Sequence, residues 1–185
     1  MALARSAGDC ALRAWRSHGR AGPLGGATWQ GELDRAVLWL DALPFDGRIV
    51  ELGAGIGFWT VLLASRGDTS AYDDREHCLE RARRRLIAHG LTAHLHPRAI
   101  DAAPEGAPAG LVLLPFVLSQ RDGASRARMV EAAHDWLATG GRLAVIDPRR
   151  LGRVVGDPDL SALGPDATTV TVPVLRRAVV GGTTS

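Results

Sequence analysis

The segment that decides the fold is Arg48-Ile49-Val50-Glu51-Leu52-Gly53-Ala54-Gly55-Ile56-Gly57-Phe58-Trp59-Thr60. Its first part, Ile49 to Leu52, is a short apolar run typical of a buried strand. The residues after Thr60, Val61 to Ala64, suit a helix that packs back on a sheet. Three glycines at alternate positions lie in the turn between them, where glycine permits a positive φ and lets a ligand approach the backbone. A turn at the carboxyl end of a parallel strand is a favoured position for a ligand.

The spacing of these glycines separates two kinds of nucleotide-binding turn. The dinucleotide fingerprint G-x-G-x-x-G would place its third glycine at position 58, which is Phe58. The segment instead resembles E/D-x-G-x-G-x-G, the first motif of the class I S-adenosylmethionine-dependent methyltransferases. The resemblance implies S-adenosylmethionine as the cofactor and S-adenosylhomocysteine as the product. It assigns to the cofactor-binding turn Glu51, Gly53, Ala54, Gly55 and Gly57.

Later segments resemble further motifs of this family, in the right order. Thr69 to Asp73 resembles a second strand that ends in an acid 20 residues after Gly53, and a carboxylate there can accept hydrogen bonds from both ribose hydroxyls. Ala99 to Ala102 resembles the third motif, in which the acid faces the adenine amino group. Leu111 to Ser119 resembles the fourth strand and its exit, and Leu137 to Asp147 a helix end, a Gly-Gly turn and the fifth strand. The resemblance adds to the expected cofactor site Asp73, Asp74, Ile100, Asp101, Ala102, Pro115 and Phe116.

The fold expected from these segments is a single α/β domain. It is a Rossmann-like doubly wound sheet, mostly parallel with an antiparallel last strand, with helices on both faces. Thr168 to Val174 and Ala178 to Val180 predict two strands around Arg176-Arg177, and a helix is predicted to begin at Thr28. The chain is expected to divide into an N-terminal lid or loose segment (1–28), the methyltransferase domain (29–180) and a tail (181–185).

Composition and charge are those of an ordinary globular protein. The chain has 185 residues and a formal net charge of +2, and all 22 of its Lys and Arg residues are arginine. This small excess of positive charge argues against nucleic acid as a partner, because nucleic-acid affinity comes from neutralising phosphates. The dense run from Arg81 to Arg85 is read as the solvated face of a helix. Two cysteines, Cys10 and Cys78, favour a reducing, cytoplasmic setting, and no membrane span or signal peptide is predicted.

The exit of the fourth strand bears on the methyl acceptor. Leu114-Pro115-Phe116 lacks the polar residue and second proline of the D/N-P-P-Y/F pattern, which disfavours methylation of exocyclic amines in nucleic acid. The chain contains no Asn, and the spacing of its histidines does not suit a metal, so a metal-independent reaction is expected. Phe116 to Gln120 resembles the F-x-L-S-H segment of some bacterial small-molecule methyltransferases, with glutamine in place of histidine. The expected substrate-binding residues are Trp29, Trp59, Phe116, Ser119 and Gln120.

Two residues are candidates for a general base, Asp147 at the end of the fifth strand and His18 in the N-terminal segment. Each also has a simpler reading, Asp147 as a turn cap before Pro148 and His18 as a solvated residue. The main hypothesis is a biosynthetic enzyme that transfers methyl to an O, N or C nucleophile of a small molecule. Two alternatives stay open, an RNA methyltransferase and a non-methylating partner subunit that binds the cofactor. A homodimer is also left open.

Overall fold

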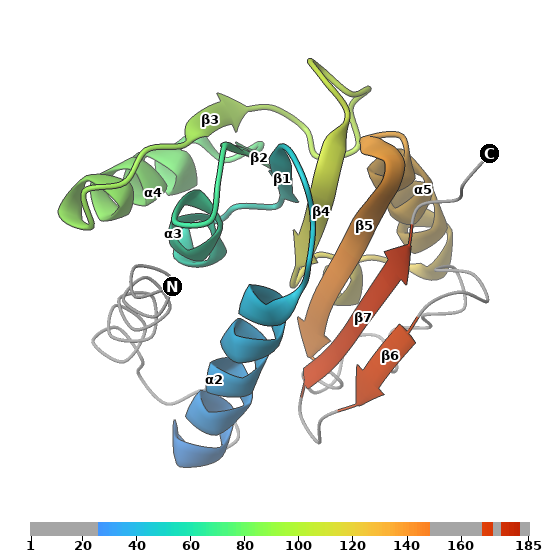
Figure 1. The fold of residues 1–185 in the computed structure, drawn as a ribbon, viewed down its shortest axis with the longest axis horizontal. Helices are drawn as coiled ribbons and strands as arrows, with labels where there is room; N and C mark the ends of the chain where they lie inside the picture. Colours follow the sequence, from blue (N-terminus) through green and yellow to red (C-terminus); the bar gives the residue numbers. More distant parts are fainter. Residues whose placement is uncertain (1–25, 149–167, 172–174, 182–185) are drawn as a thin grey trace.

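One mixed sheet forms the centre of the structure, a computed structural model that describes residues 26–148, 168–171 and 175–181 (Figure 1). Its strand order is β3-β2-β1-β4-β5-β7-β6. Five strands are parallel: β1 (Ile49–Leu52), β2 (Thr69–Asp73), β3 (His94–Pro97), β4 (Ala109–Pro115) and β5 (Leu137–Pro148). β7 (Leu175–Gly181) runs antiparallel to β5, and β6 (Thr168–Thr171) runs antiparallel to β7. The doubly wound α/β fold class is confirmed.

Helices cover both faces of this sheet (Figure 1). α2 (Gly26–Ala42) and α3 (Phe58–Ala64) pack on one face, where Ile49, Leu111 and Leu113 meet them in one apolar cluster. α4 (Glu76–Ala88) joins that face through Leu79, which packs against Ala71. α5 (Gly123–His134) covers the opposite face, where it meets the intervening strand residues. A short 3-10 turn, η1 (Leu118–Gln120), connects β4 to α5.

The central strands are buried on both faces because helices cover both. β1 and β4 are buried at every position, so their sequences read as apolar runs rather than as alternating ones, with Glu51 as the one charged residue among them. β1 pairs with both β2 and β4, although β2 and β3 lie between β1 and β4 in the chain. The strand order therefore reverses between β1 and β4, and the carboxyl ends of these two strands form the crevice where open α/β sheets bind ligands.

Two helix boundaries differ from the sequence prediction. α2 begins at Gly26 rather than at Thr28. The predicted helix end at Leu137 is wrong, because α5 ends at His134 and Leu137 already pairs with Ala109 in β5. The residues between Leu137 and Arg142 form an irregularity in which Gly140 has φ 76°.

The C-terminal strands also differ from the prediction. Arg176-Arg177 lies inside β7, paired with β5, rather than in the turn between the last two strands. Gly181 belongs to β7 and not to a tail. Two consecutive arginines predict a break between strands, but in the sheet they are consecutive residues of one strand. The rest of the expected tail and nearly all of the expected N-terminal segment lie outside the described residues.

Candidate functional site

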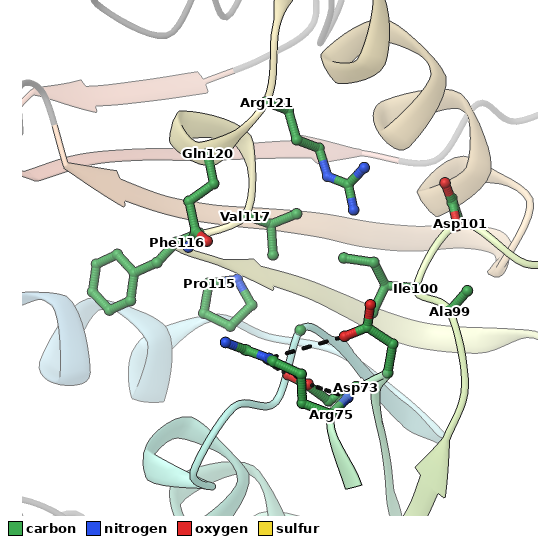
Figure 2. Close-up of a pocket in the computed structure, with 12 residues that line it drawn as sticks. Asp73, Arg75, Ala99, Ile100, Asp101, Pro115, Phe116, Val117, Gln120 and Arg121 are labelled. Atoms are coloured by element: carbon green, nitrogen blue, oxygen red, sulfur yellow. Dashed lines mark hydrogen bonds and ion pairs between the residues drawn. The ribbon is translucent and has the colours of Figure 1, made fainter. Parts of the chain in front are cut away.

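An open cavity of about 380 Å³ lies at the reversal point of the strand order. Its walls come from the turn after β1, the end of β2, the loop after β3, and the turn between β4 and α5 (Figure 2). Twelve residues line it: Gly53, Asp73, Asp74, Arg75, Ala99, Ile100, Asp101, Pro115, Phe116, Val117, Gln120 and Arg121. Segments far apart in the sequence thus meet around one space that is open to solvent on one side.

The glycine turn after β1 needs its glycines for different reasons. All three have positive φ, 95° at Gly53, 52° at Gly55 and 78° at Gly57. A Cβ at Gly57 would lie 2.6 Å from the Cβ of Ala82, so this glycine lets α4 pack closely against the turn. A Cβ at Gly55 would meet nothing within 4 Å, so there is space beside this glycine for a ligand. The turn is therefore fixed on its α4 side and open at Gly55.

Asp73 connects the ends of β1 and β2. Its carboxylate is buried and accepts a hydrogen bond from the backbone N–H of Gly55 at 2.8 Å. The same carboxylate accepts three hydrogen bonds from Arg75, one from its backbone and two from its guanidinium. Burial opposes ionisation of Asp73, but these hydrogen bonds outweigh it and hold the pKa of the carboxyl below its ordinary value. Asp73 is therefore a buried anion that is fully engaged with its neighbours.

Glu51, the acid ahead of the glycines, lies in the sheet rather than in the cavity wall. It is completely buried, and the Thr60 hydroxyl donates to its Oε2 at 2.6 Å. Its Oε1 is buried and has no hydrogen-bond partner among the described residues. The pKa of Glu51 is raised to about 8, mainly by burial; the Thr60 hydrogen bond opposes this rise and the nearby Asp73 charge adds to it. Glu51 is therefore protonated at neutral pH.

The turn between β4 and α5 forms the wall opposite Asp73. Phe116 has φ 57°, an uncommon conformation for a bulky residue, and its N–H donates to the Ile146 carbonyl at 2.7 Å. The N–H of Leu118 donates to Oδ2 of Asp147 at 2.8 Å. The buried guanidinium of Arg126 donates to the carbonyls of Leu118 and Arg121. The buried carboxylate of Asp147 and the buried guanidinium of Arg126 thus hold this strained turn from two sides.

The sequence predicted most of the cavity wall. The lining residues that had been assigned to the cofactor or the substrate are Gly53, Asp73, Asp74, Ile100, Asp101, Pro115, Phe116 and Gln120. Ala54, Gly55, Gly57 and Ala102 belong to the same loops but do not line the cavity, and Glu51 lies in β1 behind it. These positions agree with the predicted geometry, and the role of each residue stays a prediction.

The other predicted residues lie away from the cavity or outside the described part. Trp59, an expected substrate-binding residue, is 3% exposed and packs against the rings of Phe58 and Phe116 in the core. Asp147 is fully buried and holds the Leu118 backbone. His18 and the side chains of Trp29 and Ser119 lie outside the described residues.

Four lining residues were not predicted: Arg75, Ala99, Val117 and Arg121. Ala99 and Val117 are immediate neighbours of predicted residues, so their assignment needed only a wider window around each motif. Arg75 and Arg121 could not be assigned to the site from the sequence, because arginine accounts for all 22 of the Lys and Arg residues and occurs throughout the chain. Among the described residues, no group of three or more His, Cys, Asp and Glu side chains could hold a metal ion. No helix in the described ranges is both long and apolar enough to span a membrane.

Comparison with known proteins agrees with this geometry. Residues 29–154 match the methyltransferase small domain family. No curated protein matches the sequence. Among solved structures, the fold is similar to magnesium protoporphyrin IX methyltransferase (ChlM) from Synechocystis PCC 6803 with bound SAM, at TM-score 0.67 and 16% identity, covering 92% of this chain and 90% of that one.

Two further structures have the same fold. A putative rRNA methylase from Clostridium thermocellum matches at TM-score 0.60 and 15% identity, over 75% of this chain and 88% of that one. TehB from Haemophilus influenzae matches at TM-score 0.62 and 12% identity over 83% of this chain, which spans only 62% of TehB. The family match covers most of the chain, and the fold and the cavity agree with it, so the chain belongs to the class I S-adenosylmethionine-dependent methyltransferases.

Proposed function

We propose that this protein transfers a methyl group from S-adenosylmethionine to an oxygen, nitrogen or carbon nucleophile of a small molecule, without a metal. The observation that carries the proposal is the cavity that brings Gly53, Asp73, Asp101 and Phe116 together at the strand-order reversal. S-adenosylmethionine supplies a methyl group that its sulfonium already activates, and S-adenosylhomocysteine is the product.

The residues around the cavity suit the nucleoside part of this cofactor. Asp73 would accept from the ribose hydroxyls, and Asp101 is exposed on the cavity wall beside Ile100, where it would meet the adenine amino group. The open space at Gly55 leaves room for a ligand against the backbone. The buried Oε1 of Glu51, which has no hydrogen-bond partner within the described part of the chain, adds a polar atom behind the same turn.

The acceptor would approach from the side of Phe116, Gln120 and Arg121, which line the cavity opposite Asp73. ChlM acts on magnesium protoporphyrin IX, and its similar fold supports a small-molecule acceptor. Asp147 is a poor candidate for the general base, because it is buried and accepts from the Leu118 backbone. Rate enhancement would then come mainly from alignment of the nucleophile with the sulfur–methyl bond, which can contribute on the order of several kcal/mol.

RNA is the second candidate acceptor, favoured by the fold similarity to a putative rRNA methylase. The arginines of α4 are the obvious place for a phosphate backbone. Two of them, Arg83 and Arg84, are paired with Glu80, which lowers the charge available for RNA. A cytoplasmic, biosynthetic role is the setting that we expect for the small-molecule reaction.

Calorimetric titration with S-adenosylhomocysteine and S-adenosylmethionine tests the proposal. The parent should bind both, and Asp73→Ala should weaken binding by roughly 1 to 3 kcal/mol, the cost of an unmade hydrogen bond to a charged group. Asp68→Ala is the matched control: this acid is exposed, lies immediately before the same strand, and its replacement should leave binding unchanged. A folded parent that binds neither ligand would refute the proposal. With binding established, transfer of labelled methyl to small-molecule extracts rather than to RNA would separate the two acceptor classes.

A further inference from the structure

Arg75 occupies the acceptor positions that the ribose would need. An ionised carboxylate has about four acceptor positions, two on each oxygen. In Asp73, Oδ1 accepts from the backbone N–H and from Nε of Arg75, both at 3.0 Å. Oδ2 accepts from the Gly55 N–H at 2.8 Å and from Nη2 of Arg75 at 3.1 Å. All four positions are therefore filled, two by main-chain groups and two by the Arg75 side chain.

Departure of the Arg75 side chain would free one position on each oxygen. The main-chain N–H of Gly55 would stay on Oδ2 and that of Arg75 on Oδ1, so the carboxylate would keep its orientation. The two freed positions match in number the two hydroxyls of a ribose. Figure 2 shows the Arg75 side chain lying against Asp73 in the cavity, drawn with its hydrogen bonds.

The Arg75 side chain can move from Asp73 into water. It is 56% exposed, whereas the Asp73 carboxylate is 3% exposed and would keep its hydrogen bonds from the two main-chain N–H groups. Asp74 lies 3.9 Å from its Nε and is itself 74% exposed, so a second carboxylate is available to the guanidinium near the solvent. Arg75 makes no side-chain capping bond to α4, although it is the residue before that helix.

We propose that Arg75 sets the cofactor affinity of this site, because its guanidinium competes with the ribose hydroxyls for the carboxylate of Asp73. The inference rests on the proposed function, since it concerns the same cofactor. Only molecules in which the guanidinium has left Asp73 can bind the cofactor. The measured dissociation constant is therefore the intrinsic constant divided by the fraction of such molecules. Arg75 thus weakens cofactor binding, although it lines the cofactor cavity.

The test is calorimetry on the parent, Arg75→Ala and Arg84→Ala. Arg84 is the matched control, because it is exposed, is on the adjoining helix and is paired with a carboxylate, Glu80. Arg75→Ala should bind S-adenosylhomocysteine about three- to five-fold more tightly than the parent, and Arg84→Ala should bind it like the parent. S-adenosylmethionine should show the same gain, because both ligands have the same ribose.

Comparison of the two ligands separates competition from general charge effects. A loss of positive charge alone would favour the cationic S-adenosylmethionine over S-adenosylhomocysteine. Equal affinity of Arg75→Ala and the parent, weaker binding by the variant, or a gain confined to S-adenosylmethionine would each overturn the inference while leaving the proposed function intact. Absence of binding by all three folded proteins would overturn the proposed function and, with it, the inference.

Discussion

Replacing Glu51 with glutamine should make the stability of the protein less dependent on pH. Glu51 is buried in β1 with a pKa of about 8, against 4.5 in the unfolded chain. Between these values the folded state holds a proton that the unfolded state has lost. The free energy of unfolding therefore falls as the pH rises, because unfolding releases the proton. Glutamine has the shape of the protonated acid and can still accept from Thr60, but it cannot ionise.

The size of the effect follows from the pKa difference. One pKa unit corresponds to about 1.4 kcal/mol, so Glu51 should lower the free energy of unfolding by about 1.4 kcal/mol for each pH unit between pH 5.5 and pH 7.5. The total over that window is about 3 kcal/mol, a large part of the roughly 5 to 15 kcal/mol that stabilises a typical domain. Below pH 4.5 the contribution is fully retained, and it is lost as the pH rises through about 8.

Urea unfolding at pH 5.5, 6.5 and 7.5 measures the difference between the parent and Glu51→Gln. Other groups, such as His96, whose pKa burial lowers, titrate in both proteins and cancel in the comparison. Glu80→Gln is the control, because Glu80 is exposed and its pKa lies below this window. The variant should gain stability relative to the parent as the pH rises. If the two proteins keep a constant difference at all three pH values, Glu51 is not protonated in the folded state and the burial argument fails.

Two further predictions concern the walls of the cavity. Gly57→Ala should lower the free energy of unfolding, measured in urea, by about 2 to 4 kcal/mol, because the new Cβ would meet the Ala82 backbone at 2.7 Å. Gly55→Ala, with open space around the new Cβ, should lower it by only about 1 to 2 kcal/mol. Equal losses in the two variants would contradict the packing explanation. Arg126→Met should lower the free energy of unfolding by about 1 to 3 kcal/mol and weaken S-adenosylhomocysteine binding, because the carbonyls of Leu118 and Arg121 lose their buried donor. Arg128→Met, at an exposed position of the same helix, should change neither quantity. Unchanged ligand affinity in Arg126→Met would show that the turn it supports does not contribute to ligand binding.

The parts of the fold that could be predicted are those where one local pattern has one structural solution. The strand, the glycine turn and the helix around Gly53 to Gly57 follow from apolar periodicity and from positions that need positive φ. Asp73 could be placed at the cavity because it ends a buried parallel strand next to β1. Parallel strands align their carboxyl ends, so acids and glycines that end such strands gather at one edge of the sheet.

The contacts that sequence could not supply depend on tertiary packing. A Cβ at Gly110 would lie 1.6 Å from the backbone oxygen of Asp46, and the local sequence does not predict this clash. Arg126 reads as one more polar residue of α5, yet it is 6% exposed and binds two carbonyls of the preceding turn. The pairing of Arg75 with Asp73 likewise depends on a side-chain conformation rather than on spacing. Arginine in particular has too many uses for its position in a sequence to reveal which one it serves.

Three buried acids at strand ends, each in a different state, bear on the chemistry that the site can perform. Glu51 is protonated at neutral pH, so it can donate but cannot act as a base. Asp73 is ionised and its acceptor positions are filled by Gly55 and Arg75. Asp147 accepts from the Leu118 backbone and supports the turn of Phe116. None of the three presents an available basic oxygen to the cavity, so none of them can take a proton from a methyl acceptor. An acceptor that had only these three acids beside it would need to be already ionised, or to be an amine neutral at the working pH, rather than an alcohol that must first lose its proton.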